Sequence, residues 1–332
     1  MKQIIVGLKQ AIKPIFIRLF PDAMKMREIR AYGKMCDMLM EEYRRMTKEE
    51  KAARLAIRYR EITGRELNVD DPKRFTDKLI WRILNYDHPV YSRLSDKYMV
   101  REWVARKIGE EYLIPLLGVW DKFDEIDFDA LPDAFVLKTN HASGTNIIVK
   151  DKKALNRKTA KAWMDTWMKY PFCIFGYEAH YDRIRPKIIA EELMKPEDGA
   201  DDIQDYKFLC FDGQPYYCWV DVDRWHGHKR NLYDMEWNLQ EWICNADFPP
   251  VGRTIEKPGN FDVMIELVRK LSAGFAQVRV DLYNIGEKIY FGEMTFTSAA
   301  GMARCEPEEM DYFVGNLWDI HKRQVDEEVV NA

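Results

Sequence analysis

The N-terminal quarter of the chain has the apolar spacing of helices. Seven apolar side chains from Ile4 to Leu19 share one face at about 100° per residue, with lysines along its flank. Pro14 should kink this helix or begin its second half. A charge-rich helical pattern with many methionines continues over residues 21–90. We therefore predict a helical region over residues 1–90.

Beyond this region the pattern changes to short apolar strands separated by turns. A periodic stretch from Asp96 to Gly109 predicts one more helix, and an extended segment follows at 113–119. Residues 187–193 form a buried strand that ends in two carboxylates. Three hairpins are predicted over residues 134–150, 206–220 and 278–293. The fold class that follows is α+β, with the helices first.

The third hairpin contains Arg279, Asp281 and Glu293. A three-residue turn at 284–286 pairs Asp281 with Ile289 and places Glu293 on the same face, whereas a four-residue turn places it on the opposite face. Two carboxylates on one face beside an arginine would suit Mg²⁺ and a phosphate. A surface ion-pair cluster is the alternative.

The first hairpin carries a small polar loop at residues 139–145, which we call the polar loop. Its backbone N–H groups can approach phosphate oxygens, and Lys138 and Lys150 on either side supply positive charge. Because the loop lacks the Gly-Lys-Ser/Thr ending of a P-loop, that fold is excluded.

Composition narrows the class of protein. The 332 residues are 47% hydrophobic and 32% charged, which excludes a disordered, collagen-like or disulfide-scaffold chain. No apolar run approaches the roughly 20 residues needed to span a bilayer, so we expect no transmembrane helix. Lys and Arg number 51 against 55 Asp and Glu, a balance that argues against a general nucleic-acid binder.

The charge is unevenly distributed along the chain. Residues 1–34 contain eight basic side chains and two acidic ones, and the rest of the chain is acidic. A basic amphipathic helix at residues 1–20 can lie on the inner leaflet of a membrane, or it can pack on the body of the protein. The sequence leaves both interpretations open.

The six cysteines are scattered, with no pair at the two-residue spacing of a zinc or redox site. We therefore predict that they are reduced core thiols in a cytoplasmic protein.

Taken in order, several motifs resemble those of ATP-grasp enzymes, specifically the branch similar to the TupA teichuronopeptide biosynthesis protein. The motifs are Asp96-Lys-Tyr-Met-Val-Arg101, Phe135-Val-Leu-Lys138, Asn140-His-Ala-Ser-Gly144, Asp205-Tyr-Lys-Phe208, Arg279-Val-Asp281 and Gly292-Glu-Met-Thr-Phe296. The resemblance covers about residues 90–320. It implies an ATP-grasp domain over 91–320, in which two α+β subdomains, about 100–190 and about 190–320, clasp ATP.

The resemblance also implies roles for individual residues, which we carry over by position. The ATP phosphates would contact Arg101, Lys138, Ser143, Gly144 and Lys207. The adenine edge would meet Glu191, Glu192 and Leu193, and the ribose would meet Asp205. Mg²⁺ would be held by Asp281, Glu293 and Thr295, with Arg279 and Lys138 as catalytic cations. The family usually has asparagine where Thr295 stands, which leaves a second metal ion open.

Other motifs support different interpretations. The Asp221-Val-Asp223 tripeptide resembles the metal motif of glycosyltransferases, although it also fits the end of the second hairpin. His226-Gly-His228 is either a metal site or a solvated loop. His141 in the polar loop is a candidate donor to ATP or substrate. A non-catalytic nucleotide-binding adaptor is a third alternative, because of Thr295.

The function that we predict is an ATP- and Mg²⁺-dependent, ADP-forming carboxylate–amine ligase of cell-surface polysaccharide assembly. It would join an amino acid or amine to a sugar acid in the cytoplasm, with a peripheral membrane contact through residues 1–20 and no nucleic-acid partner.

Overall fold

The computed structural model describes residues 22–196, 203–223, 227–244 and 248–330. Their contacts divide the chain into two compact units, each of which is described by itself. The first unit contains residues 22–46, Asp96–Tyr98 and Ile114–Met194, and the second contains Thr47–Ser95, Met99–Leu113 and 195–330. The predicted helical region therefore supplies helices to both units. The helix expected at residues 1–20 lies outside the described residues.

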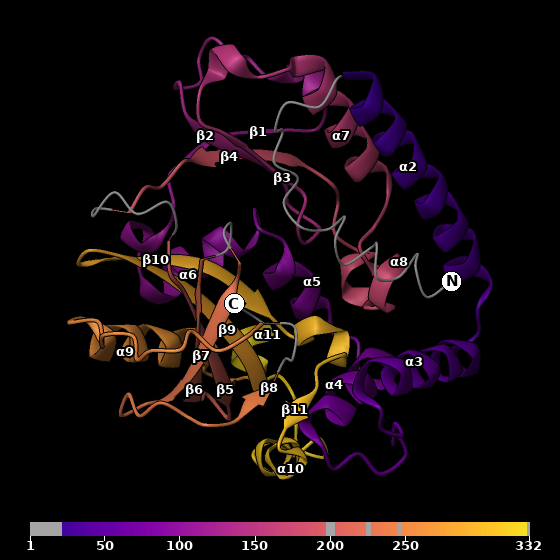
Figure 1. Ribbon diagram of the computed structural model, residues 1–332, viewed down its shortest axis with the longest axis vertical. Coiled ribbons are helices and arrows are strands. Elements are labelled where there is room, and N and C mark those ends of the chain that lie inside the picture. Colours follow the sequence, from indigo (N-terminus) through magenta and orange to yellow (C-terminus); the bar gives the residue numbers. More distant parts are fainter. Residues whose placement is uncertain (1–21, 197–202, 224–226, 245–247, 331–332) are drawn as a thin grey trace. The chain divides into compact units, whose positions relative to one another are not determined.

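The first unit is a four-stranded antiparallel sheet in the order β1-β4-β2-β3, with helices packed on one face (Figure 1). Its elements are α2 Asp22–Arg45, β1 Leu116–Trp120, η2 Phe123–Glu125, β2 Phe135–Thr139, β3 Asn146–Val149, η3 Lys152–Ala154, α7 Arg157–Lys169, α8 Cys173–Gly176, η4 Ala179–Tyr181 and β4 Ile188–Glu192. The predicted first hairpin is β2–β3, and the strand that ends in two carboxylates is β4.

Helix α7 shows why this unit folds as it does. The Asn156 side chain caps its first turn by accepting a hydrogen bond from the Thr159 N–H at 3.0 Å. Trp163 and Trp167 then lie on one face of the helix and pack with Phe135 of the sheet. The opposite face, which we call the polar face, carries Lys138 and Glu191 beside apolar side chains such as Ile189.

The second unit is built on a five-stranded antiparallel sheet in the order β10-β9-β5-β6-β7. Its helices are α3 Lys48–Thr63, α4 Phe75–Asn85, α5 Pro89–Ser95, α6 Val100–Ile108, η1 Glu110–Tyr112, α9 Phe261–Ser272, η5 Ser298–Gly301, α10 Glu308–Asn316 and α11 Glu327–Val330. Its strands are β5 Asp205–Phe211, β6 Gln214–Val222, β7 Lys229–Asp234, β8 Ile243–Cys244, β9 Gln277–Ile285, β10 Lys288–Thr295 and β11 Cys305–Glu306.

Alternation along the strands separates the two faces of this sheet. Phe208 and Val280 point into a core that includes Met264 of α9. On the other face, Leu209 packs with Phe75 of α4 at one end of the strands. The other end of that same face carries charged side chains, which are described below.

The third hairpin, β9–β10, differs from the prediction in its turn. The turn consists of two residues, Gly286-Glu287, and the register shifts by one residue before Glu293. Asp281 therefore lies opposite Glu293 and not opposite Ile289. A Cβ atom on Gly292 would lie 3.0 Å from the Asp281 carbonyl oxygen, a tight contact, so the bulge favours glycine. Of the two alternatives that the sequence left open, the structure has the one in which both carboxylates share a face, although through a different turn.

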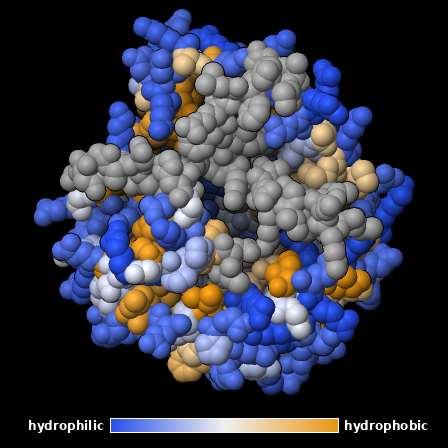
Figure 2. Space-filling view, in the orientation of Figure 1, coloured by the Kyte–Doolittle hydropathy of each residue, from blue (hydrophilic) through white to orange (hydrophobic). Residues whose placement is uncertain are grey.

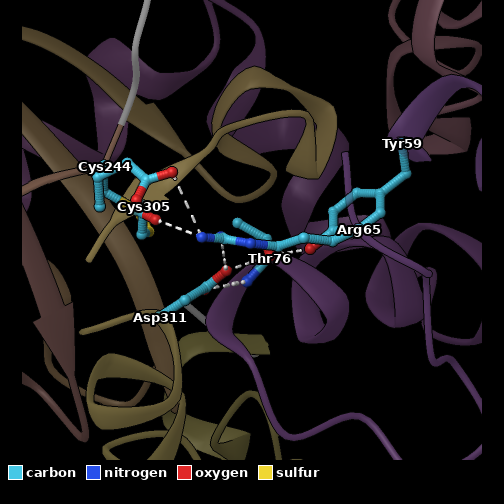
Figure 3. Close-up of a disulfide and its surroundings, with 7 residues drawn as sticks. Tyr59, Arg65, Thr76, Cys244, Cys305 and Asp311 are labelled. Carbon is cyan, nitrogen blue, oxygen red and sulfur yellow. Dashed lines mark hydrogen bonds and ion pairs between the residues drawn. A yellow bond between two sulfur atoms is a disulfide. The ribbon is translucent and has the colours of Figure 1, made fainter. Parts of the chain in front are cut away.

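One cysteine prediction is wrong. Strands β8 and β11 pair so that Cys244 lies opposite Cys305, and the two form a disulfide (Figure 3). Short sequence spacing could not indicate this bond, because the partners are 61 positions apart and meet only through strand pairing. Four further cysteines are buried free thiols, as predicted: Cys36, Cys173, Cys210 and Cys218.

On the face shown in Figure 2, hydrophobic residues form small groups separated by hydrophilic ones. No helix among the described residues is both long enough and apolar enough to cross a membrane.

Candidate functional site

A row of charged side chains crosses the sheet of the second unit on the face opposite α9. Residues paired across antiparallel strands point to the same face. Lys207 pairs with Asp281, Asp281 with Glu293, and Arg279 with Thr295. With the neighbouring Asp205, we call this group the sheet cluster: Asp205, Lys207, Arg279, Asp281, Glu293 and Thr295.

Asp281 lies between two cations. Arg279 binds it with a fork, since Nε donates to Oδ1 at 2.7 Å and Nη2 donates to Oδ2 at 2.8 Å. Lys207 Nζ donates to Asp281 Oδ2 at 2.7 Å and to Asp205 Oδ2 at 2.5 Å. Burial would raise the pKa of Asp281, but Arg279 and Lys207 outweigh burial and hold that pKa below its ordinary value. The aspartate is therefore ionised at neutral pH.

Arg279 also connects Asp281 to the exposed end of the cluster. Its Nη2 donates to Glu293 Oε1 at 2.9 Å and to Thr295 Oγ1 at 3.0 Å, and Nη1 contacts Ser298 Oγ at 3.3 Å. The Glu293 side chain is 42% exposed, whereas that of Asp281 is 2% exposed. The cluster can therefore be reached from solvent at Glu293.

The oxygens of the sheet cluster suit Mg²⁺, which prefers hard oxygen ligands. Asp281 Oδ1 accepts one bond, and Glu293 Oε2 accepts none from the described residues. Thr295 offers a hydroxyl. Three or more His, Cys, Asp and Glu side chains do not gather into a metal site anywhere in the described part of the chain. The arrangement fits an ion held by two carboxylates and completed by water and phosphate oxygens.

The charged row continues to the far strands through Asp221. Arg230 forks onto it, with Nε at 2.5 Å from Oδ1 and Nη2 at 2.8 Å from Oδ2, and His228 Nε2 lies 3.3 Å from Oδ2. Burial would raise the pKa of Asp221, but Arg230 holds it well below its ordinary value. Asp223 is instead half-exposed and lies 3.5 Å from Lys229. The Asp-x-Asp tripeptide thus does not present two open carboxylates.

In the first unit, the polar face of the sheet carries Lys138 and Glu191. Lys138 Nζ lies 2.5 Å from Glu191 Oε2, with side chains that are 20% and 6% exposed. Glu192, the last residue of β4, is exposed, and Leu193 follows it. The predicted adenine edge therefore lies where this strand ends, and its role stays a prediction.

The polar loop has a fixed base and an exposed tip. The Asn140 side chain accepts a hydrogen bond from the Lys187 N–H at 2.7 Å and donates to the Arg185 carbonyl at 3.0 Å. Ser143 and Gly144 are exposed, and Gly144 has a φ of 73°. The loop can therefore offer its tip to a ligand without losing its anchors.

Two further contacts fix the polar loop, and the contact of His141 contradicts its predicted role as a donor to a ligand. Lys97 Nζ donates to the Ala142 carbonyl at 2.6 Å. His141 is fully buried, and its Nε2–H donates to the Tyr170 carbonyl at 3.2 Å. Burial lowers the pKa of His141 to about 4, so the ring is neutral and has no second N–H for ATP or substrate. His141 anchors the loop and is not a donor to a ligand.

The predicted site residues are shared between the two units. Lys138, the polar loop and the end of β4 belong to the first unit, and Arg101 on α6 belongs to the second with the sheet cluster. The sequence reasoning missed Lys97 and Arg230. Lys97 stands in the motif from which Arg101 was chosen, but Arg230 gave no signal, because only the β6–β7 register places it on this face.

The fold is that of an ATP-grasp protein. The chain belongs to the TupA-like ATP-grasp family, whose family model matches residues 77–319, and thus to the ATP-grasp ligase superfamily. None of the curated proteins matches the chain.

Several solved structures are similar to this chain at low identity. The D-alanine–D-alanine ligase from Bacillus anthracis complexed with ATP is 13% identical, with 62% of this chain and 55% of that chain covered and a TM-score of 0.37. The D-alanine–D-alanine ligase from Helicobacter pylori is 10% identical, with 70% of this chain and 60% of that chain covered and a TM-score of 0.38. The N5-carboxyaminoimidazole synthetase from Staphylococcus aureus complexed with ADP is 12% identical, with 69% of this chain and 52% of that chain covered and a TM-score of 0.38. The chain thus spans little more than half the length of these proteins.

Proposed function

We propose that the protein is an ATP- and Mg²⁺-dependent, ADP-forming carboxylate–amine ligase of cell-surface polysaccharide assembly. Its substrates would be a sugar acid and an amino acid or amine. The observation that carries the proposal is the sheet cluster. Two cations and two carboxylates suited to bind Mg²⁺ share one face of the sheet, and solvent reaches them at Glu293.

The proposed reaction has two steps. A carboxylate oxygen of the sugar acid attacks the γ-phosphorus of ATP, and ADP leaves with the electrons of the broken P–O bond. The amine nitrogen then attacks the acyl carbon, phosphate leaves, and the proton of the amine passes to solvent. Both steps develop negative charge on phosphate oxygens, which fixed cations stabilise. Arg279 and Lys138 would supply that positive charge as catalytic cations, with Lys207 beside the phosphates.

The remaining residues would bind the nucleotide. Lys138, Arg101 and the polar-loop tip at Ser143 and Gly144 would contact phosphates, and the end of β4 would meet adenine. Asp205 is proposed for the ribose, although its Oδ2 accepts from Lys207 and its side chain is buried. Asp281 and Glu293 would hold Mg²⁺, with Thr295 beside them. When bound, the ion would draw charge from the phosphate oxygens.

Hydroxylamine trapping tests this proposal. With ATP, Mg²⁺ and D-glucuronic acid, hydroxylamine replaces the unknown amine and converts an acylphosphate into a stable hydroxamate. We expect equal amounts of hydroxamate, ADP and phosphate, and none from an Arg279→Gln variant. A panel of other uronic acids extends the test to the sugar-acid class. If ADP release never depends on a carboxylate, the ligase proposal is wrong.

A second assay distinguishes the glycosyltransferase alternative from the ligase proposal. UDP-glucose replaces ATP, and release of UDP is measured in the presence of a glycan acceptor. The fork from Arg230 to Asp221 gives no support to a metal site there. UDP release that an Asp221→Asn variant abolishes would nevertheless favour the transferase.

We also propose that residues 1–20 hold the cytoplasmic enzyme at the inner leaflet, because this segment combines an apolar face with lysines. Sedimentation with phosphatidylglycerol vesicles tests this. The full chain should bind and a chain lacking residues 1–20 should not. Neither should bind phosphatidylcholine vesicles. Equal sedimentation of both chains would contradict the proposal.

A further inference from the structure

An open cavity of about 400 Å³, with exposed charged side chains in its lining, lies at the surface of the first unit, away from the polar face of its sheet. One stripe of α2, from Asp37 to Arg45, lines one side, and Lys169 and Tyr170 at the end of α7 line the other. The α2 side chains recur at the three- and four-residue spacing of a single helix face. No role assigned above uses this cavity.

The cavity carries one unbalanced positive charge. Asp37 is neutralised by Lys169, whose Nζ lies 2.8 Å from Oδ1, and Glu41 is neutralised by Arg45 at 2.5 Å. Arg44 is exposed and makes no hydrogen bond or ion pair with the part of the chain that the structure describes. Its guanidinium is therefore the group in the lining that lacks a described counter-ion.

We propose that this cavity binds a polyhydroxylated anion of sugar size, with its carboxylate or phosphate on Arg44. A guanidinium binds either group with two parallel hydrogen bonds. The volume is in the range of small-molecule sites, but those are usually lined by apolar side chains. Here the lining is mainly charged, and the carboxylates of Asp37 and Glu41 can accept ligand hydroxyls, while Met40 offers an apolar surface to a sugar ring.

Tyr170 connects this cavity to the polar loop. Its hydroxyl lies 2.7 Å from Asp37 Oδ1, and its backbone carbonyl accepts the His141 N–H at 3.2 Å. A ligand that moves Asp37 or Tyr170 therefore also moves the anchor of the loop. This second part of the inference rests on the proposed function, which assigns the loop to ATP. Because coupling between two binding sites is reciprocal, ATP should alter sugar-anion affinity by the same factor.

Titration calorimetry of the full chain tests the cavity itself. D-glucuronic acid and glucose 6-phosphate are the probes, and the tighter one identifies the anion; neutral glucose is the control. We expect Arg44→Gln to weaken binding at least about tenfold. Lys34→Gln removes a charge from an exposed position on the same helix outside the lining and should change affinity less than about twofold.

Three results would overturn the cavity proposal. They are an equal loss in both variants, equally tight binding of neutral glucose, and no binding of either anion at millimolar concentration. None of them depends on whether the protein is a ligase.

The connection is tested by AMP-PNP affinity with and without the tighter sugar anion. We expect a change of about fivefold, which Tyr170→Phe should abolish, since it removes the hydroxyl and keeps the carbonyl. An unchanged affinity would overturn the connection and leave the cavity standing. Absence of AMP-PNP binding would overturn the proposed function and the connection together, and sugar-anion binding would still decide the cavity.

Discussion

Two buried ion networks in the second unit differ in what holds them. The first is the sheet cluster. The second, which we call the helix cluster, joins the segment after α3, the start of α4 and α10, and it consists of Arg65, Arg74, Thr76, Asp77 and Asp311. Figure 3 labels three of its members: Arg65, Thr76 and Asp311. In the helix cluster, backbone groups bind the charges: the Thr76 N–H donates to Asp311 at 3.0 Å, and Arg65 donates to the Cys305 carbonyl at 3.0 Å.

The charged groups of the sheet cluster have different partners. Those of Lys207, Arg279 and Asp281 bind only side chains among the described residues. A charge bound to backbone cannot leave without disturbing the fold, whereas two side chains can separate when a phosphate or metal ion arrives. Burial of charge alone therefore does not identify a site. Exchangeable partners and an exposed end distinguish the sheet cluster.

The largest expected effect comes from Glu293→Gln. Loss of the proposed metal ligand should lower turnover about a thousandfold, equivalent to about 4 kcal/mol. The free energy of unfolding should change by less than about 1 kcal/mol, because the side chain is 42% exposed. ADP release and urea unfolding measure the two quantities.

A matched control for this variant lies beside the helix cluster. Glu308 is 41% exposed and lies 3.1 Å from Arg74, so Glu308→Gln removes a similar charge next to a similar arginine. Its turnover should equal that of the unaltered protein. Equal losses in both variants would remove the distinction between the clusters.

Arg74→Met should reverse the pattern. Arg74 Nε lies 2.9 Å from Asp77, and the two side chains are 7% and 2% exposed. Removal of the cation leaves a buried carboxylate unpaired, so unfolding free energy should fall by about 3–5 kcal/mol. Turnover per folded molecule should be unchanged. A stable variant that turns over slowly would assign the helix cluster to the site.

Reduction of the disulfide should also act on stability. The bond closes a loop between residues 61 positions apart, and the chain-entropy model gives a contribution of about 4 kcal/mol for that length. Urea unfolding with and without dithiothreitol measures it, and a Cys244→Ala/Cys305→Ala variant should not respond to the reductant. Because Cys305 also contacts Arg65, unchanged stability on reduction would weaken the view that this region is a structural anchor.

The smallest effect concerns pH. Burial raises the pKa of Asp311 to about 6, so the folded state binds a proton that the unfolded state, with a pKa of about 3.9, has lost. This group therefore favours folding most below about pH 4, and the benefit, about 3 kcal/mol, is lost as pH rises through 6. Unfolding measured from pH 4 to 7 should show this slope relative to Asp311→Asn. Identical slopes would contradict the assignment.

Alternation and turn residues predicted most of the sheet structure. The hairpin predicted over residues 206–220 turns at Asp212-Gly213, and both residues tolerate the positive φ that a tight hairpin needs, here 46° and 73°. The turn of β9–β10 was misplaced because a bulge leaves no mark on apolar alternation. Strands β8 and β11 are two residues each, too short to show a period, so their disulfide was missed as well.

The site was predictable where residues lie on recognised hairpins. Asp281 and Glu293 belong to one hairpin, so local pattern brings them together. The contact of Lys207 with Asp281, two residues that are 74 positions apart, instead depends on the pairing of β5 with β9. Such pairings depend on tertiary packing and not on local pattern. The anchoring role of His141 could not be predicted either, because it depends on the Tyr170 carbonyl.

The bulge at Gly292 makes the β9–β10 hairpin sensitive to insertions and deletions. Deletion or insertion of one codon between Asp281 and Glu293 would turn Glu293 to the opposite side of the strand, even if every charged residue were kept. Many substitutions in the exposed turn should be harmless, but a change of length should not. In this hairpin the number of residues between Asp281 and Glu293 matters as much as the identity of the two carboxylates.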